Sequence, residues 1–210
     1  MQINRNYHIW EATTMKDGTR PALQHISIQR TDPVQHHVNE DPYNGIALAA
    51  NGYILAIVPV RLDPEDVTGL VNWNSFREAI KASAKVKWQR DDLLIVLKED
   101  ALDVFGYGFP RFESTNDKLL TFPNYSQLIR RPSDTYDAPN LGINPALLGK
   151  LAVAIGAPEG VCCNLISPTS PIMVKPVDSQ YHENPWQPPY GMIMPMFATQ
   201  PKRQEATVAA

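Results

Sequence analysis

Residues 45–60 read GIALAANGYILAIVPV and decide the fold, because they form two apolar runs on either side of Asn51-Gly52. An Asn-Gly pair between apolar runs is the strongest short-range signal for a β-hairpin, since both residues tolerate positive φ. We therefore predict two buried strands, at 45–50 and 53–60, joined by a tight turn. Polar Asn51 interrupts the apolar stretch, which falls short of a membrane span.

A helix and a meander of strands follow the hairpin. The segment 72–85 has apolar residues at helical spacing, and either Asn72 or Asn74 suits its N-cap. The expected core stripe of this helix is Trp73, Phe76, Ile80 and Ala84. Three strands are predicted after the helix, at 86–89, 93–98 and 102–109. This unit is therefore a helix followed by antiparallel strands.

The same order recurs in the C-terminal half of the chain. Asn144 and Pro145 provide an N-cap and a first helical residue for a helix at 146–155, and Gly156 closes it. Strands are predicted at 161–166, 172–177 and 190–196. Two such units predict an α+β fold with helices packed on one face of antiparallel sheets.

The remaining segments set the expected domain boundaries. A strand is predicted at 22–29, but the sequence leaves the fold of residues 1–44 open. The proline-rich stretch 120–139 predicts a linker. The expected domains are 1–128 and 129–198, followed by a flexible tail at 199–210. The 19 prolines against 11 glycines imply many strand ends and ordered loops.

Composition describes an ordinary soluble protein. The chain has 210 residues, a formal charge of −3 and 43% apolar residues, enough for a sizeable core without covalent staples. Its two cysteines, Cys162 and Cys163, are adjacent, and no CxxC motif occurs. Residues 1–10 lack the apolar segment of a signal peptide. We therefore expect a cytoplasmic protein in a reducing compartment.

Three short strings resemble those of one family, the bacterial DNA polymerase III β subunit, or sliding clamp. Residues 50–56, ANGYILA, resemble its Thr-Asp-Gly-His-Arg-Leu-Ala string. Residues 122–125, FPNY, resemble the Phe-Pro-Asp-Tyr string at the start of its third domain. Residues 194–196, MPM, resemble the Met-Pro-Met near its C-terminus. The strings occur in the family's order, and the resemblance over 45–197 implies a DNA-clamp-like fold.

The sequence also departs from the family pattern. The family's first domain has no counterpart, and the first half of its third domain is missing between Arg131 and Asn140. Tyr53 and Ile54 stand where the family string has histidine and arginine. The chain continues beyond Phe197, where the family typically ends in Arg-Leu. It therefore resembles a divergent and abbreviated clamp.

The resemblance implies an apolar groove that binds short peptides of polymerases and repair proteins. In the family the groove forms where the first string meets the Met-Pro-Met strand. The matching residues here are Gly52, Tyr53, Ile54, Leu55, Pro123, Met194, Pro195 and Met196. Flexible thioethers and an exposed aromatic side chain adapt to varied peptide side chains. The alternative interpretation is that Leu55, Met192 and Met194 are ordinary strand core.

A basic stripe on the first predicted helix is the second candidate site. Arg77, Lys81 and Lys85 each follow a core position by one, so they lie about 100° around the helix. Lys87, just beyond the predicted helix, adds a fourth basic residue. Helices with such residues line the central hole of the family's clamps and contact duplex DNA phosphates without reading sequence. The alternative is a solvated helix face, and the second helix offers only Lys150.

No motif indicates catalysis. His36 and His37 lie among acidic residues, but adjacent histidines on an extended segment point in opposite directions, so we expect a hydrated loop and no metal. Of Cys162 and Cys163, one thiol is expected to face the core and the other the surface, with nothing basic beside them. Nucleophile-elbow, phosphate-loop, zinc-protease and dinucleotide motifs are absent from the sequence. We expect a protein without catalytic residues or cofactors.

Together these features predict a non-enzymatic processivity or recruitment factor of DNA replication. It would form a homo-oligomer around duplex DNA and present its groove to a DNA polymerase or repair protein. A second hypothesis is a non-ring, clamp-derived adaptor that competes for clamp-binding partners. A third, an unrelated α+β enzyme, stays open, and so does the question of whether the ring closes.

Overall fold

The computed structural model describes residues 1–14, 19–31, 43–85, 92–125, 142–157, 159–165, 170–177 and 189–196. Several predictions concern residues outside these ranges. They are the strand at 86–89, the pair His36-His37, most of the linker at 120–139 and the tail at 199–210. Within the described part of the chain, no helix is both long enough and apolar enough to cross a membrane.

The hairpin predicted from Asn51-Gly52 is confirmed. It joins β3 (Gly45–Ala50) to β4 (Ile54–Val60), and all but one of their residues are buried. Gly52 has a φ of +89°, which its lack of a Cβ allows at no steric cost. The backbone N–H of Asn51 donates to the carbonyl of Ile54 at 3.2 Å and closes the turn.

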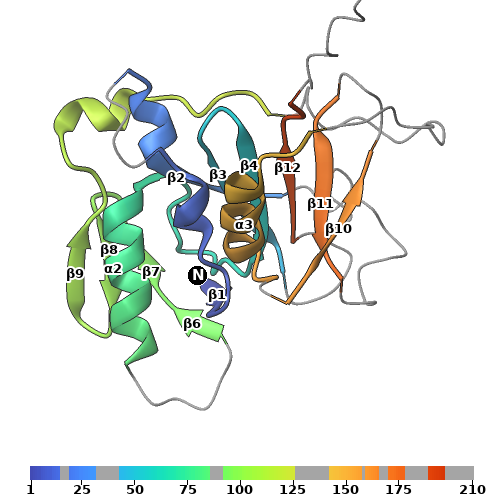
Figure 1. Ribbon diagram of the computed structural model, residues 1–210. Coiled ribbons are helices and arrows are strands. Elements are labelled where there is room, and N and C mark those ends of the chain that lie inside the picture. Colours follow the sequence, from blue (N-terminus) through green and yellow to red (C-terminus); the bar gives the residue numbers. More distant parts are fainter. Residues whose placement is uncertain are drawn as a thin grey trace, which may run out of the picture.

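This hairpin lies inside an antiparallel sheet of seven strands (Figure 1). From edge to edge the strands are β10 (Val161–Asn164), β11 (Ile172–Pro176), β12 (Tyr190–Ile193), β4, β3, β2 (His25–Arg30) and β5 (Gly69–Asn72). Because β12 pairs with β4, strands from both sides of residue 128 belong to one sheet. The expected division at 128 stays a prediction.

Two α-helices cover one face of this sheet, as predicted for an α+β fold. They are α2 (Trp73–Ala84) and α3 (Pro145–Ala154), capped by Asn72 and Asn144, whose side chains accept hydrogen bonds from backbone N–H groups of the first turn. Both helices bury residues in one core with the sheet and with the 3-10 helix η1 (Ile9–Ala12). On α2, Ser83 is buried where Ala84 was predicted to be, and Ala84 is exposed.

Shorter strands complete the chain and correct several predictions. β1 (Gln2–Asn4) pairs with β6 (Asp92–Leu94). A three-stranded sheet contains β7 (Val96–Leu97), β8 (Ala101–Val104) and β9 (Tyr107–Pro110). The single strand predicted at 102–109 is wrong, because the chain reverses at Phe105 and Gly106, which both have positive φ. The strand predicted at 93–98 is interrupted at Ile95, between β6 and β7.

The ends of other predicted strands also differ from the structure. The strand predicted at 22–29 begins only at His25, because Pro21 opens a 3-10 helix, η2 (Pro21–Gln24). The predicted strand 190–196 ends at Ile193, and the strands predicted at 161–166 and 172–177 are shorter in the same way. Pro195 cannot donate to a ladder, which limits the length of β12.

Arg111 ties the three-stranded sheet to the edge of the large one. Its side chain is only 2% exposed, and its guanidinium donates to four backbone carbonyls. The acceptors are Leu70 at 2.7 Å and Val67, Thr68 and Lys98 at 2.8 Å each. Burial lowers the pKa of Arg111. The four carbonyls thus solvate a buried cation, and the guanidinium in turn satisfies carbonyl groups beside the edge strand β5.

Candidate functional site

The sheet face opposite the helices carries a second apolar cluster, called the groove face below. Its buried members are Ile46, Leu48, Leu55, Ile57, Tyr190 and Met192. Residues 120–125, the strap, follow the 3-10 helix η3 (Thr115–Leu119), and Phe122 and Tyr125 of the strap pack against this cluster. The strap is tied to β2, because the hydroxyl of Tyr125 donates to the side-chain carbonyl of Gln29 at 3.2 Å.

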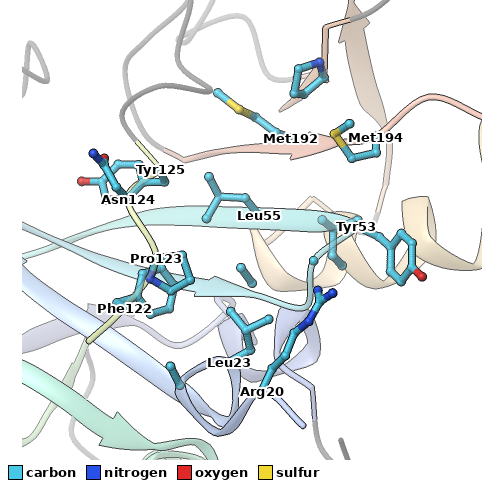
Figure 2. A pocket seen from close by; sticks show the side chains of 15 residues that line it. Arg20, Leu23, Tyr53, Leu55, Phe122, Pro123, Asn124, Tyr125, Met192 and Met194 are labelled. Atoms are coloured by element: carbon cyan, nitrogen blue, oxygen red, sulfur yellow. The ribbon is translucent and has the colours of Figure 1, made fainter. Parts of the chain in front are cut away.

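An apolar groove opens between the strap, the hairpin tip, η2 and β12, with a cavity of about 410 Å³. It is lined by Arg20, Ala22, Leu23, Ala50, Gly52, Tyr53, Ile54, Leu55, Phe122, Pro123, Asn124, Tyr125, Pro171, Met192 and Met194. Figure 2 shows Leu55 between the two methionines, Met192 and Met194, and Leu23 of η2. In the same view the strap and Tyr53 lie at opposite ends of the groove. Apolar side chains of the sheet and the flexible thioethers of the two methionines therefore line one open cavity.

The rim of the groove is held by backbone contacts. The N–H groups of Tyr53 and Ile54 donate to the side-chain oxygen of Asn51 at 3.0 and 3.1 Å. The N–H of Met194 donates to the carbonyl of Tyr53 at 2.9 Å, which joins the end of β12 to the hairpin tip. With their backbones fixed, the side chains of Tyr53 and Met194 are 64% and 42% exposed. Exposed apolar side chains on a fixed backbone are typical of binding surfaces.

The groove is close to neutral. Burial raises the pKa of Tyr125, and burial together with Tyr125 raises the pKa of Tyr190, so both hydroxyls stay protonated at neutral pH. Among the described residues of the lining, Arg20 alone is charged. Its Nη1 atom lies 2.7 Å from where a Cβ on Gly52 would stand, but this end of the side chain can move aside, so Gly52 is required by its φ of +89°. The arrangement favours an apolar ligand with one polar or anionic group near Gly52.

The structure brings together six of the eight residues predicted for the groove. Gly52, Tyr53, Ile54, Leu55, Pro123 and Met194 line the cavity. Pro195 and Met196 do not, because the backbone of Met196 pairs instead with Gly142, through hydrogen bonds of 2.8 and 3.2 Å. The Met196 side chain is exposed beyond the cavity.

Sequence reasoning missed one wall of the groove. Arg20 precedes the strand predicted at 22–29, which includes Leu23, and no local signal places either residue beside the hairpin. Phe122 and Tyr125 lie within the FPNY string, which could have identified them. Met192 was named only in the alternative interpretation, as strand core, and it is both buried and part of the lining.

Two residues of the predicted basic stripe, Arg77 and Lys81, lie on α2, and Lys85 is the C-cap of this helix. Arg77 is half-buried, Lys81 and Lys85 are exposed, and Lys87 lies outside the described residues. Lys81 donates to Glu78 at 3.0 Å, and this hydrogen bond is the main reason that the pKa of Glu78 is lowered. An exposed pair of this kind is weak and exchanges readily for other partners.

The cysteine prediction is corrected. Neither thiol is fully buried, since Cys162 is half-buried and Cys163 exposed. Lys175 of β11 stands directly opposite Cys162, so a basic residue does neighbour the pair. Partial burial and the neighbouring Cys162 nevertheless raise the pKa of Cys163, which disfavours a reactive thiolate. Among the described residues, no group of three potential metal ligands gathers.

The fold is that of the sliding clamps of DNA polymerase III. No family model matches the sequence, and no curated protein matches it. A DNA polymerase III β structure from Caulobacter crescentus superposes with a TM-score of 0.61 at 14% identity, over 94% of this chain and 65% of that one. A Pseudomonas aeruginosa sliding clamp solved with a ligand gives 0.60 at 13% identity, over 94% and 66%. The β subunit of Thermotoga maritima gives 0.56 at 12% identity, over 94% and 65%.

The extent of these matches fits the resemblance seen in the strings. The chain spans about 65% of the length of the clamps that it matches. Their identity of 12–14% supports the fold, and the activity of this chain has to be argued from its own residues.

Proposed function

We propose that this protein is a non-enzymatic, clamp-like factor of DNA replication that binds a short peptide of a polymerase or repair protein in its groove. The observation that carries the proposal is the groove itself, an apolar cavity of about 410 Å³ between β4, β12 and the strap. Its lining includes residues from all three strings that resemble the family, so the fold and the local residues point to the same use.

Peptide binding fits the chemistry of the lining. Leu55 and Met192 supply a buried apolar floor, while Tyr53 and Met194 are exposed at the rim. Apolar anchors in a desolvated pocket carry most of the free energy of such interfaces. Arg20 adds a cation for a polar group of the peptide. Pro195 and Met196, next along the chain, are the proposed continuation of the groove.

Association with DNA and with further copies of the chain extends the proposal. Arg77, Lys81, Lys85 and Lys87 would contact phosphates in a salt-dependent, sequence-independent way. Strands β9 and β10 lie at sheet edges and contain no charged residue. Uncharged edge strands are suited to pairing with another chain. Homo-oligomerisation around duplex DNA would use these edges.

A fluorescent clamp-binding peptide tests the groove. We expect saturable binding that weakens at least tenfold with Leu55→Ala or Met194→Ala, because each change removes an apolar anchor. Val177→Ala is the matched control, since Val177 is exposed but outside the groove lining. Met196→Ala should have a smaller effect than Met194→Ala. Absence of binding to the wild-type protein would contradict the proposal.

The second hypothesis, an adaptor without a ring, is favoured by one observation. Helix α3 carries a single basic residue, Lys150, and so offers little charge for DNA phosphates. Light scattering and retention on circular against linearised DNA separate the hypotheses. A ring is retained on circles and lost from linear ends, whereas an adaptor binds the peptide as a monomer and ignores both DNA forms.

A further inference from the structure

A buried histidine lies beside η3, at the start of β2. The side chain of His25 is 2% exposed, and its Nδ1 atom lies 3.0 Å from the carbonyl oxygen of Pro21. Because a carbonyl only accepts hydrogen bonds, Nδ1 carries the hydrogen of the neutral ring. The Nε2 atom then presents a lone pair.

That lone pair faces a carboxylate. Nε2 lies 3.8 Å from Oδ2 of Asp117 and, among the described residues, has no hydrogen-bond partner. Oδ2 of Asp117 is fixed in place, since it accepts from the backbone N–H groups of Glu113 and Ser114 at 3.1 and 2.9 Å. Two acceptors therefore face each other in a buried site, an arrangement that a single proton converts into a charge-assisted hydrogen bond.

The elements packed against β2 bring little other charge to this ring. The sequences of β3, β5 and η2 contain no charged residue. The charged side chains of α2 are Arg77, Glu78 and Lys81, none of which is buried. Lys118 of η3 is paired with Asp100. Asp117 is the one carboxylate that the described residues place within 4 Å of His25.

Each member of this pair holds one wall of the groove. His25 holds η2 through Pro21, and η2 supplies Leu23 to the lining. Asp117 caps η3, which runs directly into the strap, and the strap supplies Phe122 to the lining. The gap between Nε2 and Oδ2 thus lies between the elements that carry these two walls.

We infer that His25 is a positioning residue of the groove, whose protonation draws η3 and the strap toward η2 and narrows the peptide site. The effect on peptide binding rests on the proposed function, whereas the pairing of His25 with Asp117 does not. A protonated Nε2 donates to a carboxylate at about 2.7–2.9 Å, so η3 would approach β2 by about 1 Å. A groove narrowed in this way at acid pH admits the side chains of a peptide less well.

The first experiment tests the pair without any ligand. His25→Asn keeps a donor near Nδ1 and Asp117→Asn keeps an acceptor, yet neither variant titrates near neutral pH. A double-mutant cycle on the unfolding equilibrium should show a coupling of about tenfold at pH 5.5 and close to onefold at pH 8, because Nε2 donates to Asp117 only when the ring is protonated. His25→Gln repeats the cycle if His25→Asn does not fold. Equal coupling at both pH values overturns the inference.

The second experiment links the pair to the groove. With a clamp-binding peptide free of histidine and acidic residues, wild-type affinity should fall about tenfold from pH 8 to pH 5.5. The fall in affinity should be less than twofold in Asp117→Asn. In His8→Asn, a control at an exposed histidine, it should equal that of the wild-type protein. A pH-independent affinity of the wild-type protein overturns the link to the groove. Absence of binding at both pH values contradicts the proposed function, and the double-mutant cycle still decides the pair.

Discussion

Gly191 of β12 leaves room for Leu151 of α3, and adding one methyl group there should destabilise the protein. A Cβ on Gly191 would stand 2.4, 2.8 and 2.9 Å from Cδ1, Cγ and Cδ2 of Leu151. Leu151 is fully buried, so its side chain cannot move into solvent. Overpacking of this kind costs about 1–3 kcal/mol, less the roughly 0.5 kcal/mol by which alanine restricts the unfolded chain. We expect Gly191→Ala to lower the unfolding free energy by about 0.5–2.5 kcal/mol.

The contact is tested by a double-mutant cycle measured with urea denaturation. Leu151→Ala alone should cost about 2–5 kcal/mol through the cavity that it leaves. In the double variant, the methyl group added at position 191 fills part of this cavity. Its loss of unfolding free energy should therefore be smaller than the sum of the two single losses by about 1 kcal/mol or more. Additive losses, within about 0.5 kcal/mol, would refute the packing argument. Gly149→Ala is the matched control, because a Cβ at this exposed position of α3 meets nothing within 4 Å and should stabilise the helix by about 0.8 kcal/mol.

Charged residues supply three more predictions. Burial lowers the pKa of Lys175 to about 8. From pH 8 to about 10.4 the unfolded chain therefore binds more protons than the folded chain, and the unfolding free energy of the wild-type protein should rise with pH. Lys175→Met should flatten this rise, as measured by urea titrations. Arg111→Met should lower the unfolding free energy by about 3 kcal/mol or more, because four carbonyls lose their donor, and a loss below about 1 kcal/mol would show that water replaces the guanidinium. Charge reversal of Arg77 and Lys81 should reduce the salt dependence of DNA binding measured by fluorescence anisotropy, whereas an unchanged slope would identify a solvated helix face.

The elements that the sequence predicted well are those whose causes are local. Asn51-Gly52 specifies a turn by itself, and the side chains of Asn72 and Asn144 cap the helices that begin one residue later. Each of these signals acts over a few residues, so no knowledge of distant contacts is needed. The FPNY and MPM strings likewise located two parts of the groove lining from short stretches.

The elements that were predicted wrongly have causes that hydrophobic periodicity does not report. Phe105 occupies a φ of +51°, a conformation that the residue itself disfavours, and the side chain of Asp103 stabilises the turn by accepting from the N–H of Gly106 at 2.8 Å. Leu23 and Arg20 reach the groove only because η2 packs beside the hairpin tip. Neither periodicity nor turn residues report such contacts between distant segments, so this wall of the groove could not be predicted.

The position of the groove is determined by packing on both faces of β12. Met192 stands opposite Leu55 of β4, and Gly191 stands opposite Ala56. A slip by one residue would turn Met192 toward the helices and place the small Gly191 on the groove face. Leu151 of α3 leaves no space for a side chain at 191, while the groove face buries Met192, so each face excludes the slipped register. The helix that packs behind the sheet thereby fixes which side chains of β12 reach the proposed peptide site.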